Sequence, residues 1–262
     1  MPAVQRILLI LALAVVNGPA RAAELTVMTS GGFTAAFNAL APGFERQTGD
    51  RIVRVYGASM GATPTAIPAR LARGEPADVV ILARGALDAL VEAGRVARGT
   101  EVDLVRSRIG LAVKAGAPKP DISTVEGLKQ TLLKAKSIAY SDSASGVYVA
   151  GELFQRLGIA AEVAPKSTMI PGTPVGLAVA RGDAEIGFQQ ISELLPIAGI
   201  RLAGPIPEPV QKITVFSAGI TTTAKSPDAA RKLIEYLASP KAWRAIRRSG
   251  VEPVSDHRPK RS

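Results

Sequence analysis

Short apolar runs alternate with longer stretches in which apolar residues recur every three or four positions. This pattern predicts strands alternating with helices. In the N-terminal part of the chain the predicted strands are 24–28, 51–56 and 78–82. The predicted helices there are 33–47, 64–73 and 87–93. Such alternation is typical of an α/β protein with largely parallel sheets.

The two longest strand-like stretches, 104–114 and 212–223, enclose a second group of elements. The elements predicted between them are strands 137–140 and 185–188 and helices 147–157 and 175–180. Two further helices, 229–237 and 241–249, follow near the C-terminus. The chain is therefore expected to leave one lobe, build another and return. The expected first lobe is 23–106 and 218–262, and the expected second lobe is 107–217.

Residues 1–22 have the pattern of a secretory signal peptide. Arg6 precedes an unbroken apolar run at 7–16, which is too short to span a bilayer. Ala20 and Ala22 fit an A-x-A cleavage site. We therefore expect cleavage after Ala22, export to the periplasm and no membrane insertion of the mature chain.

The net charge of +10 is concentrated at the C-terminal end, where 240–262 carries seven basic and two acidic residues. These charges do not alternate with aromatic residues, so a solvated surface is favoured over a nucleic-acid site. The chain has no cysteine, which excludes disulfides, thiolate metal sites and cysteine nucleophiles. A monomer that binds a small anion is the expected form.

Small or hydroxyl-bearing residues fill the junction between a strand and the next helix at four places, 29–32, 57–61, 141–146 and 171–174. A helix start presents unpaired backbone N–H groups and a partial positive charge, and glycine lets a ligand approach that backbone. One such junction alone is more often a simple helix cap. Four of them, in both lobes, favour an anion site in a crevice between the lobes.

Three segments carry a family resemblance: Leu25-Thr26-Val27 with Phe33-Thr34, the stretch 69–81 ending in Pro-Ala-Asp-Val-Val-Ile, and Ser145-Gly146-Val147-Tyr148. They resemble the periplasmic molybdate-binding proteins of ABC importers, and the similarity covers nearly the whole mature chain. The resemblance implies the two-lobed periplasmic binding protein type II fold, with two mixed sheets flanked by helices and joined by two hinge strands. It also implies a ligand held by serine hydroxyls and backbone amides.

The resemblance places that family's ligand positions on particular residues here. Its two ligand serines fall on Gly32, close to Ser30, and on Ser59. Its second-lobe amides fall near Ser145 and near Pro174 or Val175, although proline has no N–H. The expected substrate-binding residues are Ser30, Gly31, Gly32, Ser59, Met60, Arg84, Ser145, Gly146, Val147, Pro174, Val175 and Gln190.

Departures from the molybdate pattern change the expected ligand. Gly32 and Gln190 stand where the family has hydroxyl donors, and an unpaired ligand oxygen in a closed cleft costs ~1–3 kcal/mol. Molybdate is therefore expected to bind weakly. Arg84 follows the third strand, where it would either grip a carboxylate in a bidentate way or begin a helix in solvent. A di- or tricarboxylate becomes the preferred ligand class.

The segments 30–33, 57–61 and 187–190 are closer to the aconitate isomerase branch of the same family. That resemblance implies a periplasmic enzyme that interconverts trans- and cis-aconitate by an allylic proton shift, without a cofactor. The alternative is a substrate-binding protein that delivers a small carboxylate or oxyanion to an ABC permease.

Asp142 is the candidate catalytic base. The one histidine, His257, lies in the basic tail, and no cysteine exists, so carboxylates, lysines and tyrosines remain. Near the junctions these include Asp142, Tyr148 and Tyr56. A partly desolvated carboxylate with a raised pKa suits a base. A turn-capping role is the alternative for Asp142.

Overall fold

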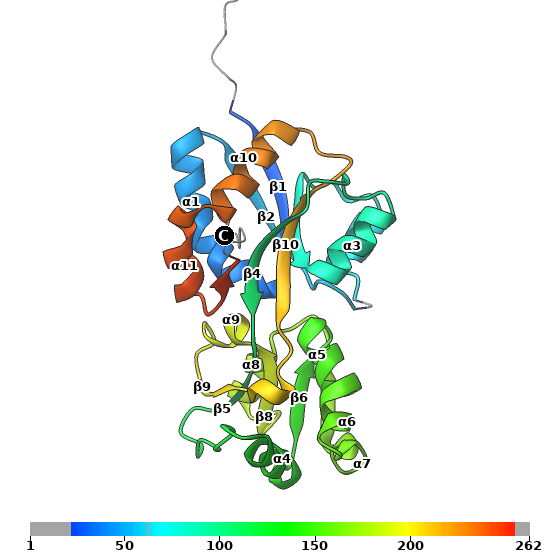
Figure 1. The fold of residues 1–262 in the computed structure, drawn as a ribbon, viewed down its shortest axis with the longest axis vertical. Helices are drawn as coiled ribbons and strands as arrows, with labels where there is room; N and C mark the ends of the chain where they lie inside the picture. The colour runs from blue at the N-terminus through cyan, green and yellow to red at the C-terminus, as the bar shows by residue number, and fades with distance from the viewer. Residues whose placement is uncertain (1–21, 62, 255–262) are drawn as a thin grey trace, which may run out of the picture.

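The computed structural model describes residues 22–61 and 63–254 (Figure 1). The predicted signal peptide up to Arg21, and His257, lie outside the described residues. Figure 1 shows two lobes, one above the other, each with a sheet flanked by helices. Within the described ranges, no helix is long and apolar enough to cross a membrane.

The first lobe is built on a six-stranded mixed sheet in the order β11-β4-β10-β3-β1-β2. Its strands are β1 (Glu24–Thr29), β2 (Arg51–Tyr56), β3 (Val79–Ala83), β4 (Val102–Ser107), β10 (Thr214–Ile220) and β11 (Glu252–Pro253). β1 runs parallel to β2 and β3, whereas β10 is antiparallel to β3 and β4. The parallel part places the ends of β1, β2 and β3 at one edge of the lobe.

Helices cover both faces of this first sheet, because apolar residues of its strands point alternately to either side. The helices are α1 (Gly31–Thr48), α2 (Ile67–Ala72), α3 (Arg84–Glu92), α10 (Pro227–Ala238) and α11 (Trp243–Arg248). On one face α1, α10 and α11 bury a core that includes Phe33, Phe37 and Leu233. On the other face α2 and α3 pack around Met28 and Leu82.

The second lobe has a five-stranded mixed sheet in the order β7-β6-β8-β5-β9. Its strands are β5 (Ile109–Lys114), β6 (Ile138–Ser141), β7 (Ser167–Ile170), β8 (Ile186–Gln190) and β9 (Ile200–Pro205). Its helices are α4 (Val125–Lys134), α5 (Ala144–Tyr148), α6 (Phe154–Arg156), α7 (Ala160–Val163), α8 (Val175–Arg181) and α9 (Ile191–Leu194). A π-helical turn, Val149–Leu153, joins α5 to α6.

Two segments of chain cross between the lobes. The stretch 104–114 is divided at Arg108, so that β4 pairs with β10 and β11 in the first sheet while β5 pairs with β8 and β9 in the second. The return crossing lies between β9 and the start of β10 at Thr214. Figure 1 shows β4 and β10 side by side between the lobes. The predicted α/β fold with two mixed sheets is confirmed.

Candidate active site between the lobes

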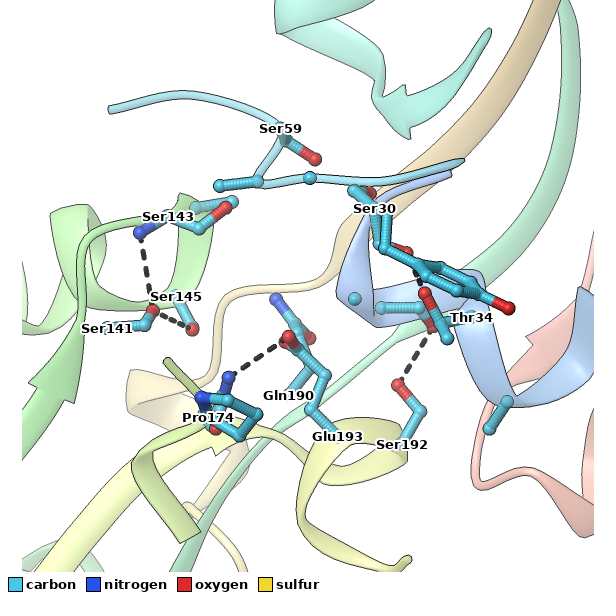
Figure 2. Close-up of a pocket in the computed structure, with 18 of the residues that line it drawn as sticks. Ser30, Thr34, Ser59, Ser141, Ser143, Ser145, Pro174, Gln190, Ser192 and Glu193 are labelled. Carbon is cyan, nitrogen blue, oxygen red and sulfur yellow. Dashed lines mark hydrogen bonds between the residues drawn. The ribbon is translucent and has the colours of Figure 1, made fainter. Parts of the chain in front are cut away.

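A pocket with a volume of 470 Å³ lies where the two lobes face each other. All four predicted junctions contribute to its wall: 30–32 and 57–59 from the first lobe, and 141–145 and 172–174 from the second. Figure 2 shows labelled serines of both lobes around the same space. Further wall residues come from the end of β8 and from the region of α9, which no predicted junction includes.

Two serines of the first lobe face the pocket in different hydrogen-bonding states. The Oγ atom of Ser59 accepts the backbone N–H of Ala83 at 2.9 Å, which leaves its hydroxyl hydrogen free to donate. Ser30 is only 1% exposed, and its Oγ has no partner among the described residues. A buried hydroxyl without a partner is unfavourable. Ser30 is therefore suited to donate to a bound acceptor.

A cluster of hydroxyls marks the start of α5 in the second lobe. The Oγ atoms of Ser141 and Ser145 are 3.0 Å apart. The backbone N–H of Gly146 donates to the same Ser141 Oγ at 3.3 Å, and that of Ser143 at 3.4 Å. These bonds are drawn in part in Figure 2. They fix the loop so that its small side chains line the pocket.

The lobes touch across the cleft, and two of these contacts involve residues of the predicted junctions. The hydroxyl of Ser192 on α9 donates to the carbonyl oxygen of Gly32 in α1 at 2.9 Å. At the other side, a Cβ atom added to Gly61 would lie 2.8 Å from the carbonyl oxygen of Asp142. Gly61 also has a φ of 102°, a region that favours glycine. The pocket is consequently held between closed lobes.

Two neighbouring glutamines end β8 at the back of the pocket. The Oε1 atom of Gln189 accepts the N–H of Val175 at 2.8 Å, so it satisfies the first residue of α8. The side-chain amide of Gln190 donates to Thr214 Oγ1 at 3.0 Å. Its Oε1 is buried and has no partner among the described residues. Gln190 therefore lines the pocket as the sequence suggested, with one unsatisfied oxygen.

Arg84 is not among the residues that line the pocket. Its guanidinium forms ion pairs with Asp88 at 2.7 Å and with Asp103 at 2.8 Å. The first pair is the helical i,i+4 contact within α3, and the second ties α3 to β4. Arg84 therefore begins α3, as the alternative for this residue proposed, and it pairs with two carboxylates of its own lobe.

Four other predicted binding residues also lie outside the pocket wall: Met60, Gly146, Val147 and Val175. Met60 packs against the core of the first lobe, and Val147 is 58% exposed. Val175 is fully buried and its N–H is taken by Gln189. Gly146 packs directly on the backbone of Ser141. Seven of the expected binding residues do line the pocket: Ser30, Gly31, Gly32, Ser59, Ser145, Pro174 and Gln190.

Two carboxylates line the pocket, and only one was singled out from the sequence. Asp142 lies in the loop before α5, where its Oδ2 accepts the N–H of Gly172 at 3.0 Å. Glu193 extends from α9 toward the centre of the pocket in Figure 2. Burial, with a smaller contribution from the negative charge of Asp142, raises the pKa of Glu193 to about 7, although hydrogen bonds from the Gln189 side chain and the Gln190 backbone lower it.

The sequence offered no motif for Glu193. An acidic residue in the first turn of a helix is ordinarily a partner of the helix dipole. The four-residue helix α9 is also too short for a periodic pattern. The available signal was that Glu193 lies three residues beyond Gln190 and five beyond the end of the predicted strand 185–188.

The chain belongs to the bacterial extracellular solute-binding protein family, whose model matches residues 25–252. An aconitate isomerase of Pseudomonas sp is 50% identical over 230 residues, which cover 88% of this chain and 88% of that protein. The molybdate-binding protein ModA of Azotobacter vinelandii is 28% identical over 243 residues, covering 88% and 90% of the two chains. The family inferred from sequence is thus confirmed.

The solved structure of the Azotobacter vinelandii periplasmic molybdate-binding protein matches the fold with a TM-score of 0.69 at 22% identity. The match covers 87% of this chain and 98% of that one. This likeness supports the two-lobed architecture on which the pocket depends.

Proposed function

We propose that this protein is an exported isomerase that interconverts trans- and cis-aconitate in the cleft between its lobes. The observation that carries the proposal is the 50% identity to an aconitate isomerase over 88% of both chains. The extracellular solute-binding family supports export, and the signal-peptide pattern of residues 1–22 supports the periplasm as the destination.

The pocket is suited to a small polycarboxylate. Its 470 Å³ lies within the range of ~300–1,000 Å³ that is typical of small-molecule sites. Hydroxyl donors face it from both lobes, among them Ser30, Ser59 and Ser145. No lysine or arginine is among the described residues that line it. The carboxylates would therefore be held by neutral donors and by backbone N–H groups at helix starts.

The proposed reaction moves one proton along an allylic system. A C–H bond of the CH2 group next to the double bond breaks, and the electron pair it leaves is shared with the conjugated carboxylate. A proton is then added to the far carbon, and the double bond shifts. Donors aimed at that carboxylate would stabilise the charge that develops on it.

A second candidate is the substrate-binding protein of an ABC importer. The family assignment and the 28% identity to the molybdate-binding protein ModA favour it. In this case the cleft would bind a carboxylate or oxyanion, and a permease would be the partner. Binding without turnover distinguishes this candidate from the isomerase.

The test of the proposed function is to incubate the purified mature protein with trans-aconitate and follow cis-aconitate by chromatography, with a chelator present. We expect product in large molar excess over the protein, and equal rates with and without the chelator. Tight binding of trans-aconitate with no product would instead support the importer candidate.

Ser30→Ala is expected to weaken trans-aconitate binding about tenfold, the loss of a hydrogen bond worth ~1–1.5 kcal/mol. The melting temperature should be unchanged or higher, since the Ser30 hydroxyl has no partner within the described protein. The matched control is Ser107→Ala, which removes another buried, unpartnered hydroxyl outside the pocket. The affinities of both variants for trans-aconitate are measured by calorimetry. Equal affinities would show that the Ser30 hydroxyl does not contact the ligand.

A further inference from the structure

Glu193 occupies an unusual position for an acidic residue. It belongs to α9 of the second lobe, yet its carboxylate lies against the first residue of α1 in the first lobe: a Cβ atom on Gly31 would be 1.8 Å from Glu193 Oε1. The same Oε1 accepts the side-chain amide of Gln189 at 3.0 Å. Gln189 is itself fixed by the N–H of Val175. A built hydrogen-bond chain therefore holds this carboxylate at the pocket wall.

No positive side chain among the described pocket-lining residues balances the charge of Glu193. The charged group that acts on it is Asp142, which is also negative. A half-buried carboxylate without a cation lowers stability, and such groups concentrate at functional sites. The uncompensated charge of Glu193 therefore indicates a functional role for this carboxylate.

The other titratable groups of the pocket wall have structural partners. Asp142 receives the N–H of Gly172 through Oδ2, and its backbone packs against Gly61 of the first lobe. The phenol of Tyr56 donates to Asn38 Oδ1 at 2.8 Å. Of the two lining carboxylates, Glu193 lies with its Oε1 against Gly31 of the opposite lobe, whereas Asp142 is held through Oδ2 by a backbone N–H of its own lobe.

We propose that Glu193, rather than Asp142, is the catalytic base of this cleft, and that it carries the proton from one end of the substrate's allylic system to the other. This inference rests on the proposed isomerase function. A Glu193 oxygen takes the proton from the CH2 carbon, and the electron pair of that C–H bond forms the new double bond. The same carboxyl group then returns the proton to the far carbon, so that no other reactant is consumed.

The absence of a side chain at Gly31 leaves room for the Glu193 carboxylate. Any side chain there would enter the space of the Glu193 carboxylate. Gly31→Ala is therefore expected to displace the carboxylate and to lower kcat more than affinity. Gly85→Ala is the matched control, because Gly85 also lies in the first turn of a helix but has nothing within 4 Å of the added Cβ.

The experiment compares wild type, Glu193→Gln and Glu152→Gln, an exposed acid outside the pocket. Glu193→Gln is expected to lower turnover of trans-aconitate ~10²–10⁴-fold, the range of a general base. Its affinity, measured by calorimetry, should stay within about threefold of wild type, and Glu152→Gln should match wild type throughout. Turnover in Glu193→Gln within about threefold of wild type overturns the role of Glu193.

Proton exchange separates this inference from the proposed function. In D2O, a base at Glu193 should replace the CH2 protons of trans-aconitate by deuterium, as followed by NMR, even where net isomerisation is slow. Exchange by wild type that is lost in Glu193→Gln supports the base, whatever the isomerisation rate. Exchange that persists in Glu193→Gln contradicts the role of Glu193 as the base but not the isomerase function. A wild-type protein that shows neither exchange nor isomerisation contradicts both proposals.

Discussion

Replacing Gly146 by alanine is expected to lower the free energy of unfolding by about 3 kcal/mol or more. The added Cβ would lie 1.5 Å from the carbonyl oxygen of Ser141 and 2.9 Å from its backbone nitrogen. Both atoms belong to the backbone of β6, so no flexible side chain can move aside. Either the start of α5 or the end of β6 must shift, and the hydroxyls of Ser141 and Ser145 would shift with it.

Gly151→Ala is the matched control for this prediction. Gly151 lies one π-helical turn further along the same helical stretch, is exposed, and has nothing within 4 Å of an added Cβ. Alanine at this position should be neutral or stabilising, because glycine is a poor helix former. Chemical denaturation of both variants provides the measurement. A Gly146→Ala protein as stable as Gly151→Ala would contradict the packing described for α5.

The value of kcat/KM for aconitate isomerisation is expected to fall about tenfold for each pH unit below about 7. A base must be unprotonated to accept a proton, and burial raises the pKa of Glu193 to about 7, with Asp142 adding a like charge. Activity should therefore rise with pH and level off above neutrality. The ionisation of trans-aconitate itself, measured by NMR in the absence of protein, must be subtracted from the profile.

The same pKa predicts how stability depends on pH. The folded protein holds a proton on Glu193 up to about pH 7, whereas an unfolded chain releases it near the ordinary glutamate pKa of 4.5. The contribution of Glu193 to stability is thus complete below pH 4.5 and is lost as the pH rises through 7. Glu193→Gln should remove this dependence of stability on pH and be at least as stable as wild type at pH 8.

For the pH dependence of activity, a kcat/KM that is flat from pH 5 to 8 would contradict a catalytic base with this pKa.

Long, regular elements could be predicted from the sequence because their burial pattern is periodic. The strand predicted at 51–56 matches β2, and the helix predicted at 33–47 lies within α1. β7 and β9 were not predicted; both are edge strands of the second sheet, β7 has only four residues, and β9 ends in Gly204 and Pro205. The stretch 104–114 gave one apolar pattern for two strands, because β4 and β5 are each buried in their own lobe.

The sequence predicts only those pocket residues that belong to a recognisable local pattern. Small residues before helices, as at Ser30, Ser59 and Ser145, are visible in the chain, and the structure brings them to one cavity. The positions of Arg84 and Glu193 depend on partners far away in sequence. Arg84 is held by Asp103 of β4, and Glu193 meets Gly31 across the cleft between the lobes. Such contacts follow from tertiary structure, which no motif encodes.

The measurement that tests the central claim most directly is proton NMR of aconitate with catalytic amounts of the purified mature protein, started separately from each isomer. We predict that both reactions reach the same ratio of cis- to trans-aconitate, in the presence of a chelator and with many turnovers per protein molecule. If trans-aconitate binds in calorimetry but neither isomer changes over the same period, the protein is a binding protein and not an isomerase.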